Sequence, residues 1–200
     1  MLCITACTSA KEPTSRQEPA LPPVLNSAPY ICSYIPEQGF HIVTGTLKFS
    51  AGKTKGTEEN GDCRIPGDPT PPLEVWWRQE GPEMPLQHLD FLLSGRRSVY
   101  MQHGGIPLPP DLGDGVAAYL PDGLLEEQPY RVSAKFRCGG KDRMLDIYLA
   151  KVAKGRDAIQ DLIALMRIAQ SRYGELYDCT PQGTQGTQGT QGTQGTQGTQ

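Results

Sequence analysis

The chain has 200 residues, of which 37% are hydrophobic, and its 19 basic and 22 acidic residues give a formal net charge of −3. This length suits one domain or a small pair of domains, and the mixed charges without a basic stripe exclude a typical nucleic-acid-binding protein. The Gly-Lys-Thr at 52–54 lacks the earlier glycine of a phosphate-binding loop, so no nucleotide is expected.

The chain begins with a small-residue sequence, Ile4-Thr5-Ala6-Cys7, that resembles the end of a bacterial lipoprotein signal. By this resemblance Cys7 is the expected lipid anchor to the membrane. Residues 1–6 are shorter than a secretory signal, which needs a basic start and about 7 to 15 apolar residues. We therefore interpret them as a truncated signal-peptide remnant whose leader lies upstream of Met1. The alternative is an accidental match in a cytosolic protein.

The two ends of the chain differ in composition from its middle. Residues 7–29 are rich in Pro, Ser and Thr and predict a tether. Residues 182–200 carry Gly-Thr-Gln six times and are expected to be disordered, because they hold nothing to bury. Slippage in a repetitive coding stretch explains this repeat; glycosylated threonines or a wall spacer are the alternatives. Residues 30–181 are expected to form a single globular domain.

Periodicity in the first half of this domain predicts two short helices and three strands. The helices are expected at 36–43, where proline suits the first turn, and at 86–93. Alternating apolar residues predict the strands, and these residues are Leu47 and Phe49, then Leu73, Val75 and Trp77, then Val116, Ala118 and Leu120.

The second half predicts a hairpin followed by a long helix. Apolar and polar residues alternate strictly over 130–137, and Gly139-Gly140 then turns the chain into a partner strand over 143–152. An apolar stripe at helical spacing runs through 156–178. We therefore predict an α+β fold, an antiparallel sheet of about five strands packed with this long C-terminal helix and the shorter helices.

The cysteines suggest an oxidising compartment. If Cys3 belongs to a removed signal and Cys7 carries lipid, four remain, which can close two disulfides, and they are Cys32, Cys63, Cys138 and Cys179. Zinc sites use cysteine pairs two to four residues apart, and the sequence has no Cys-x-x-Cys pair. No metal is therefore expected. The alternative is four buried free thiols in a cytosolic protein.

Chain geometry favours one of the three possible pairings. The strand over 143–152 would cover about 33 Å, and the helix over 156–178 would return about 35 Å. Cys179 should therefore come back beside Cys138, which leaves Cys32 to pair with Cys63.

Few side chains suggest chemistry. His103-Gly104-Gly105 is similar to the oxyanion-hole loop of esterases, but no Gly-x-Ser-x-Gly accompanies it, so a hydrolase is only the alternative to a non-enzymatic protein. His41 and His88 are expected on surface helices, and Arg96-Arg97 is too short for a basic patch. Trp76 faces away from the core side of its strand; it packs under a helix or forms a binding patch beside Tyr34 or Tyr100. No cofactor is expected.

Residues 112–119, Leu-Gly-Asp-Gly-Val-Ala-Ala-Tyr, resemble a Gly-Leu-Gly-Asp-Ala-Ala-Tyr type segment in a family of actinobacterial envelope lipoproteins of unknown function. The similarity extends over about residues 32–179: a cysteine before a short helix, another after the next strand, and a strand pair leading into a long helix. This resemblance implies a Mog1/PsbP-like α/β/α sandwich and a Gram-positive cell-envelope location. It implies no catalytic residue.

Taken together, these features predict a non-enzymatic lipoprotein on the extracytoplasmic face of the cell membrane that binds a protein partner or an envelope ligand. A secreted or soluble binding domain without an anchor is the main alternative.

Overall fold

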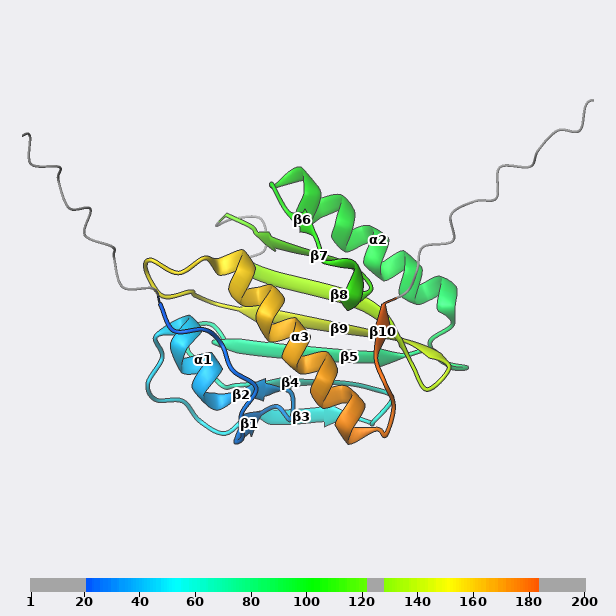
Figure 1. The fold of residues 1–200 in the computed structure, drawn as a ribbon, viewed down its shortest axis with the longest axis horizontal. Coiled ribbons are helices and arrows are strands. Elements are labelled where there is room, and N and C mark those ends of the chain that lie inside the picture. Colours follow the sequence, from blue (N-terminus) through cyan, green and yellow to red (C-terminus); the bar gives the residue numbers. More distant parts are fainter. Residues whose placement is uncertain (1–20, 122–127, 184–200) are drawn as a thin grey trace, which may run out of the picture.

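The computed structural model describes residues 21–121 and 128–183, which form an α+β domain (Figure 1). Its helices are α1 (Glu37–Thr44), α2 (Leu86–Gln102), the 3-10 helix η1 (Pro110–Leu112) and α3 (Ala158–Leu176). Its strands are β1 (Tyr30–Ile31), β2 (Ile35–Pro36), β3 (Lys53–Gly56), β4 (Asn60–Arg64), β5 (Leu73–Gln79), β6 (Ile106–Pro107), β7 (Asp114–Tyr119), β8 (Tyr130–Cys138), β9 (Lys141–Leu149) and β10 (Gln182–Gly183).

The main sheet has eight strands, so the expectation of about five was wrong. Seven strands follow the order β3-β4-β5-β9-β8-β7-β6, β10 pairs with β8, and the pairs are antiparallel. Strands β6 and β10 have two residues each, and β4 is largely polar. Such segments carry little or no hydrophobic alternation, which is the signal that predicts a strand.

The strand predicted at Leu47 and Phe49 does not form. Leu47 is 81% exposed, and Phe49 packs edge-on against Phe40 with ring centroids 5.2 Å apart. The segment is a connection whose aromatic side chain closes over α1, and the strand begins later, at Lys53.

The predicted hairpin is confirmed and lies at the centre of the sheet. Gly139 and Gly140 connect β8 to β9 with φ values of 61° and 77°, the two positive angles that a tight hairpin turn needs and that glycine adopts without strain. Strand β9 then pairs along its length with both β8 and β5.

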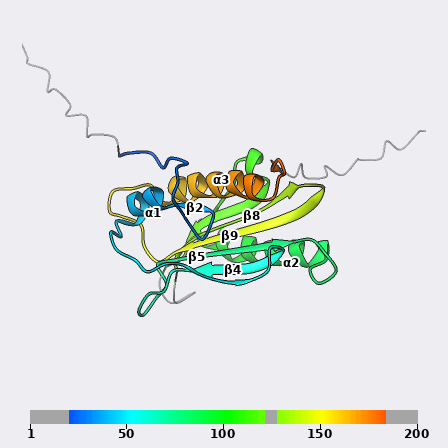
Figure 2. The same ribbon diagram turned by 90° about the horizontal axis from the view of Figure 1, so that it is seen from below.

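Helices lie on both faces of the sheet (Figure 2). Helix α3 packs on β7, β8 and β9 beside α1, and α2 packs on the opposite face of the same three strands. The Asp157 carboxylate caps α3 by accepting from the amides of Ile159 and Gln160, at 3.1 Å each. Helix α2 is longer than predicted, because the buried Tyr100 packs with Val116 and continues the helix past its polar middle.

Two disulfides tie the core together, with the pairing predicted from the sequence. Cys32 bonds Cys63, with their Cα atoms 5.5 Å apart, and joins the β1–β2 turn to β4. Cys138 bonds Cys179, at 5.4 Å, and joins the β8–β9 turn to the segment after α3. The helix does return to the turn from which β9 departs.

The packed domain reaches slightly beyond 30–181. Val24 packs against the core over Gly39, where a Cβ would stand 2.9 Å from Val24 Cγ1. Arg156 Nη1 donates to the carbonyl oxygen of Pro22 at 3.1 Å, and Gly183 pairs with Phe136 in the sheet. Cys7 and most of the Gly-Thr-Gln repeat lie outside the described residues.

Candidate binding face beside helix α2

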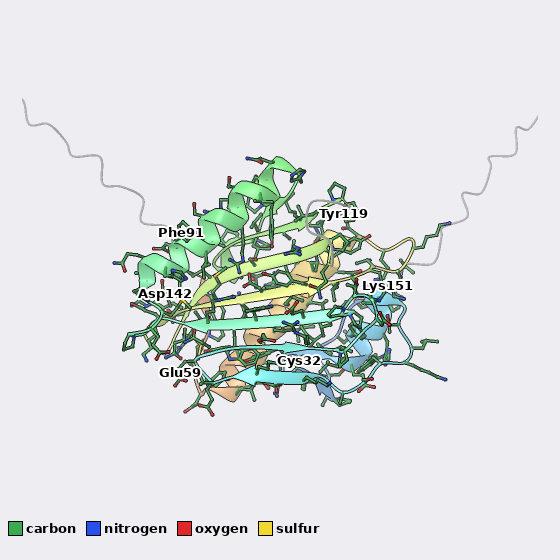
Figure 3. The ribbon with its side chains drawn as sticks, turned by 180° about the vertical axis from the view of Figure 1, so that it is seen from behind. Cys32, Glu59, Phe91, Tyr119, Asp142 and Lys151 are labelled. Atoms are coloured by element: carbon green, nitrogen blue, oxygen red, sulfur yellow. A yellow bond between two sulfur atoms is a disulfide. The ribbon has the colours of Figure 1, made fainter. Side chains whose placement is uncertain are left out.

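The sheet face that carries α2 is polar and is only partly covered by a helix (Figure 3). Directly opposed residues of antiparallel strands share a face, so the strand register defines rows of side chains across it. One row comprises Lys53, Arg64, Glu74, Tyr148 and Arg131. The next row comprises Lys55, Asp62, Trp76, Asp146 and Ser133. With Arg78 and Arg96, these residues are called the Trp76 face.

Alternation along β5 separates this face from the core. Leu73, Val75 and Trp77 point to the α3 side and are buried there, while the residues between them point to the α2 side. Helix α2 packs over β7, β8 and β9, and strands β3, β4 and β5 extend beyond it. The uncovered part of the face therefore belongs to these three strands.

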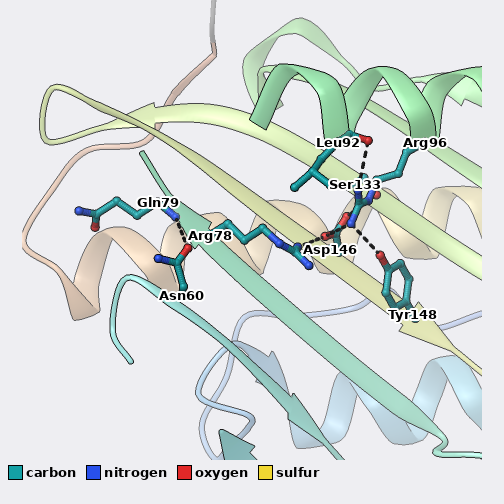
Figure 4. A network of polar contacts seen from close by, with 8 residues as sticks. All are labelled: Asn60, Arg78, Gln79, Leu92, Arg96, Ser133, Asp146 and Tyr148. Carbon is teal, nitrogen blue, oxygen red and sulfur yellow. Dashed lines mark hydrogen bonds and ion pairs between the residues drawn. The ribbon is translucent and has the colours of Figure 1, made fainter. Parts of the chain in front are cut away.

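Asp146 on β9 is the fully buried centre of the Trp76 face (Figure 4). Arg96 of α2 approaches it with Nε 2.7 Å from Oδ1 and Nη2 2.9 Å from Oδ2. Arg78 Nη1 lies 2.7 Å from Oδ2, and the Ser133 hydroxyl donates to Oδ1 at 2.5 Å. One carboxylate thus fixes groups from β5, β8 and α2.

Two guanidinium groups on one carboxylate leave a positive charge in a partly desolvated site. Burial alone would lower the pKa of Arg96, but Asp146 and Tyr148 together outweigh it and raise that pKa above its usual value. Burial, followed by the Asp146 charge, raises the pKa of Tyr148 well above normal. The arginine therefore stays charged and the phenol stays neutral.

Arginines lie over the aromatic rings of this face. The Arg78 guanidinium is 4.8 Å from the Trp76 ring centroid, and that of Arg131 is 4.6 Å from the Tyr148 ring centroid. On the uncovered side, Arg64 Nη2 lies 2.8 Å from a Glu74 carboxylate oxygen. Half-buried Trp76 is therefore framed by charged groups.

The two neighbours predicted for Trp76 lie elsewhere. Tyr34 is on the opposite face of the sheet, with its ring centroid 5.7 Å from that of Trp77. Tyr100 belongs to α2 and is buried against Val116, close to Ser133 at the covered end of the face. The arginines and carboxylates replace the expected tyrosines because adjacent strands bring polar residues, not aromatic ones, to this face.

The glycine loop at 103–105 ends α2. The amides of His103 and Gly105 donate to the carbonyl oxygen of Tyr100 at 3.0 and 2.8 Å, and that of Gly104 donates to Met101 at 3.3 Å. These amides therefore satisfy the last carbonyls of the helix and are engaged there. Among the described residues, no group of three His, Cys, Asp or Glu could hold a metal ion.

Sequence reasoning missed Asp146, Arg78 and Arg96, and dismissed Arg96 as part of a short basic pair. A usable signal was present, because Asp146 interrupts an apolar run between Leu145 and Ile147. A charge in such a strand is seldom buried without a partner. The partners themselves come from positions 50 and 68 residues earlier and could not be read from spacing.

Comparisons with protein-family models, with curated proteins and with solved structures found no match to this chain.

Proposed function

We propose that this chain is a non-enzymatic binding domain of the cell envelope, held at the extracytoplasmic face of the membrane by a lipid on Cys7. The observation that carries the binding function is the Trp76 face. Two of its arginines, Arg78 and Arg96, are held in place by the buried Asp146, and β3 to β5 present part of the face beyond α2. A rigid sheet that displays charged and aromatic groups suits recognition of a ligand.

The disulfides support the proposed compartment. Bonds such as Cys32–Cys63 and Cys138–Cys179 persist in oxidising, extracytoplasmic environments and are rare in the cytosol of mesophiles. None of the helices within 21–121 and 128–183 combines the length and hydropathy needed to cross a bilayer. Membrane attachment in this proposal therefore depends on Cys7.

The proposed family is that of the actinobacterial envelope lipoproteins, with a Mog1/PsbP-like α/β/α sandwich. Two features support this fold: helices lie on both faces of an antiparallel sheet, and the long α3 is the last helix of the domain. An experimental structure of a family member with a different strand order from β3-β4-β5-β9-β8-β7-β6 would contradict it.

The anchor is tested by growing cells that express the gene with its natural upstream sequence on a clickable fatty acid. We expect label on the wild-type protein and on Cys3→Ala, and none on Cys7→Ala. Label persisting on Cys7→Ala contradicts the anchor. Unlabelled wild-type protein in the medium indicates a secreted domain instead.

A hydrolase remains the competing class, although the hydrogen bonds of the 103–105 amides do not favour it. The wild type and His103→Ala should give the same result on a panel of ester substrates, with no hydrolysis by either protein. An esterase activity that this substitution abolishes would establish the enzyme and overturn the proposal.

A further inference from the structure

We infer that the Trp76 face binds an acidic polysaccharide, with the uncovered strands β3, β4 and β5 as the contact surface. This inference deepens the proposed binding function and rests on it, but it does not depend on the lipid anchor. It follows from the balance of charge on the face, from the kinds of group it presents, and from where the apolar residues of the domain lie.

The first argument is charge. On the uncovered strands β3, β4 and β5, the Trp76 face carries four cationic side chains against two carboxylates, whereas the whole chain has a net charge of −3. The cations are Lys53, Lys55, Arg64 and Arg78, and the carboxylates are Asp62 and Glu74. A local excess of one sign attracts ligands of the other sign, so this face is complementary to a polyanion.

The second argument is the placement of the cations. Lys53 and Lys55 are exposed on β3, the edge strand of the sheet. Both lie on the same face as Arg64, which is 41% exposed at its side chain. Because Arg64 is paired with Glu74 and Asp62, Lys53 and Lys55 are the cations of this edge that can meet carboxylate groups repeated along a chain.

Carboxylates and one aromatic ring lie beside these cations on the same face. Asp62 lies directly opposite Trp76 on the neighbouring strand β4, and Glu74 lies two residues before Trp76 on β5. Glu74 is buried against Arg64, whereas the Asp62 carboxylate, 14% exposed at its side chain, can accept a hydrogen bond from a sugar hydroxyl. The electron-rich face of an indole suits the weakly positive C–H groups of a sugar ring. An acidic polysaccharide can satisfy all three kinds of group at once.

The alternatives fit less well. The exposed large hydrophobic residues of the described domain all lie outside the Trp76 face, so a lipid surface or an apolar partner would find little there. Nucleic acid is the other polyanion, but its successive bases stack on a series of exposed aromatic rings. The Trp76 face offers only half-buried Trp76, with Arg78 over its ring, and Tyr148, which is 7% exposed beneath Arg131. The disulfides also favour an extracytoplasmic compartment.

The test measures binding of the purified soluble chain to three polymers: alginate, a polymer of uronic acids; neutral dextran; and single-stranded poly(dT). We expect alginate to bind, dextran not to bind, and the affinity for alginate to fall as NaCl rises from about 0.01 M to about 0.15 M. Lys53→Gln/Lys55→Gln should weaken alginate binding by about threefold to tenfold.

The matched control is Lys151→Gln/Lys154→Gln, which removes two exposed lysines outside the Trp76 face. It should leave alginate binding unchanged. A Trp76→Phe variant, checked for an unchanged thermal midpoint, should also bind alginate more weakly.

Three results would overturn the inference. If Lys53→Gln/Lys55→Gln and Lys151→Gln/Lys154→Gln lost equal affinity for alginate, binding would reflect general charge attraction and not a site on the Trp76 face. Tighter binding of poly(dT) than of alginate would replace the polysaccharide by nucleic acid but keep a binding face. If wild-type protein bound none of the polymers, the acidic-polysaccharide inference would fail, while the anchor at Cys7 would still be judged by fatty-acid labelling.

Discussion

Arg96 and Asp146 form a two-pronged ion pair that joins helix α2 to the central strand β9. The two contacts measure 2.7 Å from Nε to Oδ1 and 2.9 Å from Nη2 to Oδ2. Because Asp146 is fully buried, the pair is far less screened than a surface salt bridge. It therefore ties α2 to the sheet, and Arg78, which binds the same carboxylate, lies over the Trp76 ring.

Replacing Asp146 by Asn should be one of the most destabilising polar substitutions in the domain. It keeps the shape of the side chain but leaves Arg78 and Arg96, whose side chains are only 14% and 16% exposed, without their counter-ion. We expect the free energy of unfolding in urea to fall by about 3 to 5 kcal/mol.

The control for this substitution is Asp90→Asn. Asp90 pairs with Lys135 but is 51% exposed at its side chain, so its loss should change the free energy of unfolding by less than about 1 kcal/mol. Similar small effects from both substitutions would show that the buried network contributes little.

Two glycine substitutions should have opposite effects. The Trp77 ring lies directly against Gly61, its cross-strand partner, and the ring nitrogen donates to the Thr57 carbonyl oxygen at 2.8 Å. A methyl group in Gly61→Ala would displace the ring, and we expect a loss of about 1 to 3 kcal/mol. Gly95 lies in the middle of α2 with open space around it. Gly95→Ala should therefore stabilise by about 0.5 to 1 kcal/mol.

Thermal and urea unfolding of the two variants beside the wild type measure this contrast. Destabilisation by Gly95→Ala, or a neutral Gly61→Ala, would contradict the packing described for α2 or for Trp77.

The disulfide that closes the C-terminal end should contribute strongly to stability. Cys138 and Cys179 are 41 residues apart, and a cross-link of that span restricts the unfolded chain by about 4 kcal/mol in the chain-entropy picture. Cys138→Ser/Cys179→Ser should therefore unfold at markedly lower urea concentration than the wild type.

Non-reducing peptide mapping of the wild type provides the accompanying check. It should recover Cys138 linked to Cys179 and Cys32 linked to Cys63. A map with four free thiols, together with equal stability of wild type and variant, would favour the reduced, cytosolic alternative.

Tyr173 of α3, whose ring packs against those of Tyr34 and Tyr177, should make the domain sensitive to alkali. Burial raises the pKa of Tyr173 from 10.0 to about 12, with Arg143 acting in the opposite direction. Between these two values the unfolded chain loses a proton that the folded chain keeps, so rising pH favours unfolding. This contribution to stability is complete below pH 10 and is lost as the pH approaches 12.

Urea unfolding at several pH values between these limits measures the slope. Tyr173→Phe keeps the ring, which packs edge-on to Phe136 at 5.6 Å, and should reduce the slope. An unchanged slope in this variant would show that another group causes the alkaline loss.

The strongest local patterns were reliable. Strict alternation in β8, the two glycines after Cys138 and the apolar stripe of α3 each concern neighbouring residues, and all three elements form. The return of α3 to the β8–β9 turn also followed from element lengths alone, which is why the disulfide pairing could be predicted.

Weaker local patterns gave errors. Leu47 and Phe49 alternate as a strand does, yet Phe49 closes over Phe40 instead. The polar β4 forms because β5 and β3 supply its backbone partners on both sides. Pairing with other segments cannot be detected in the sequence of β4 itself.

The sequence by itself determined the central hairpin, the long C-terminal helix and the cysteines that meet across them, because hydrophobic periodicity and chain length act within short segments. Only the tertiary structure decided the Trp76 face. Its charges come from β3, β4, β5, β8, β9 and α2, and antiparallel register alone sets which of them become neighbours. Asp146 can be buried with its charge only because that register delivers two arginines and a hydroxyl to the same point.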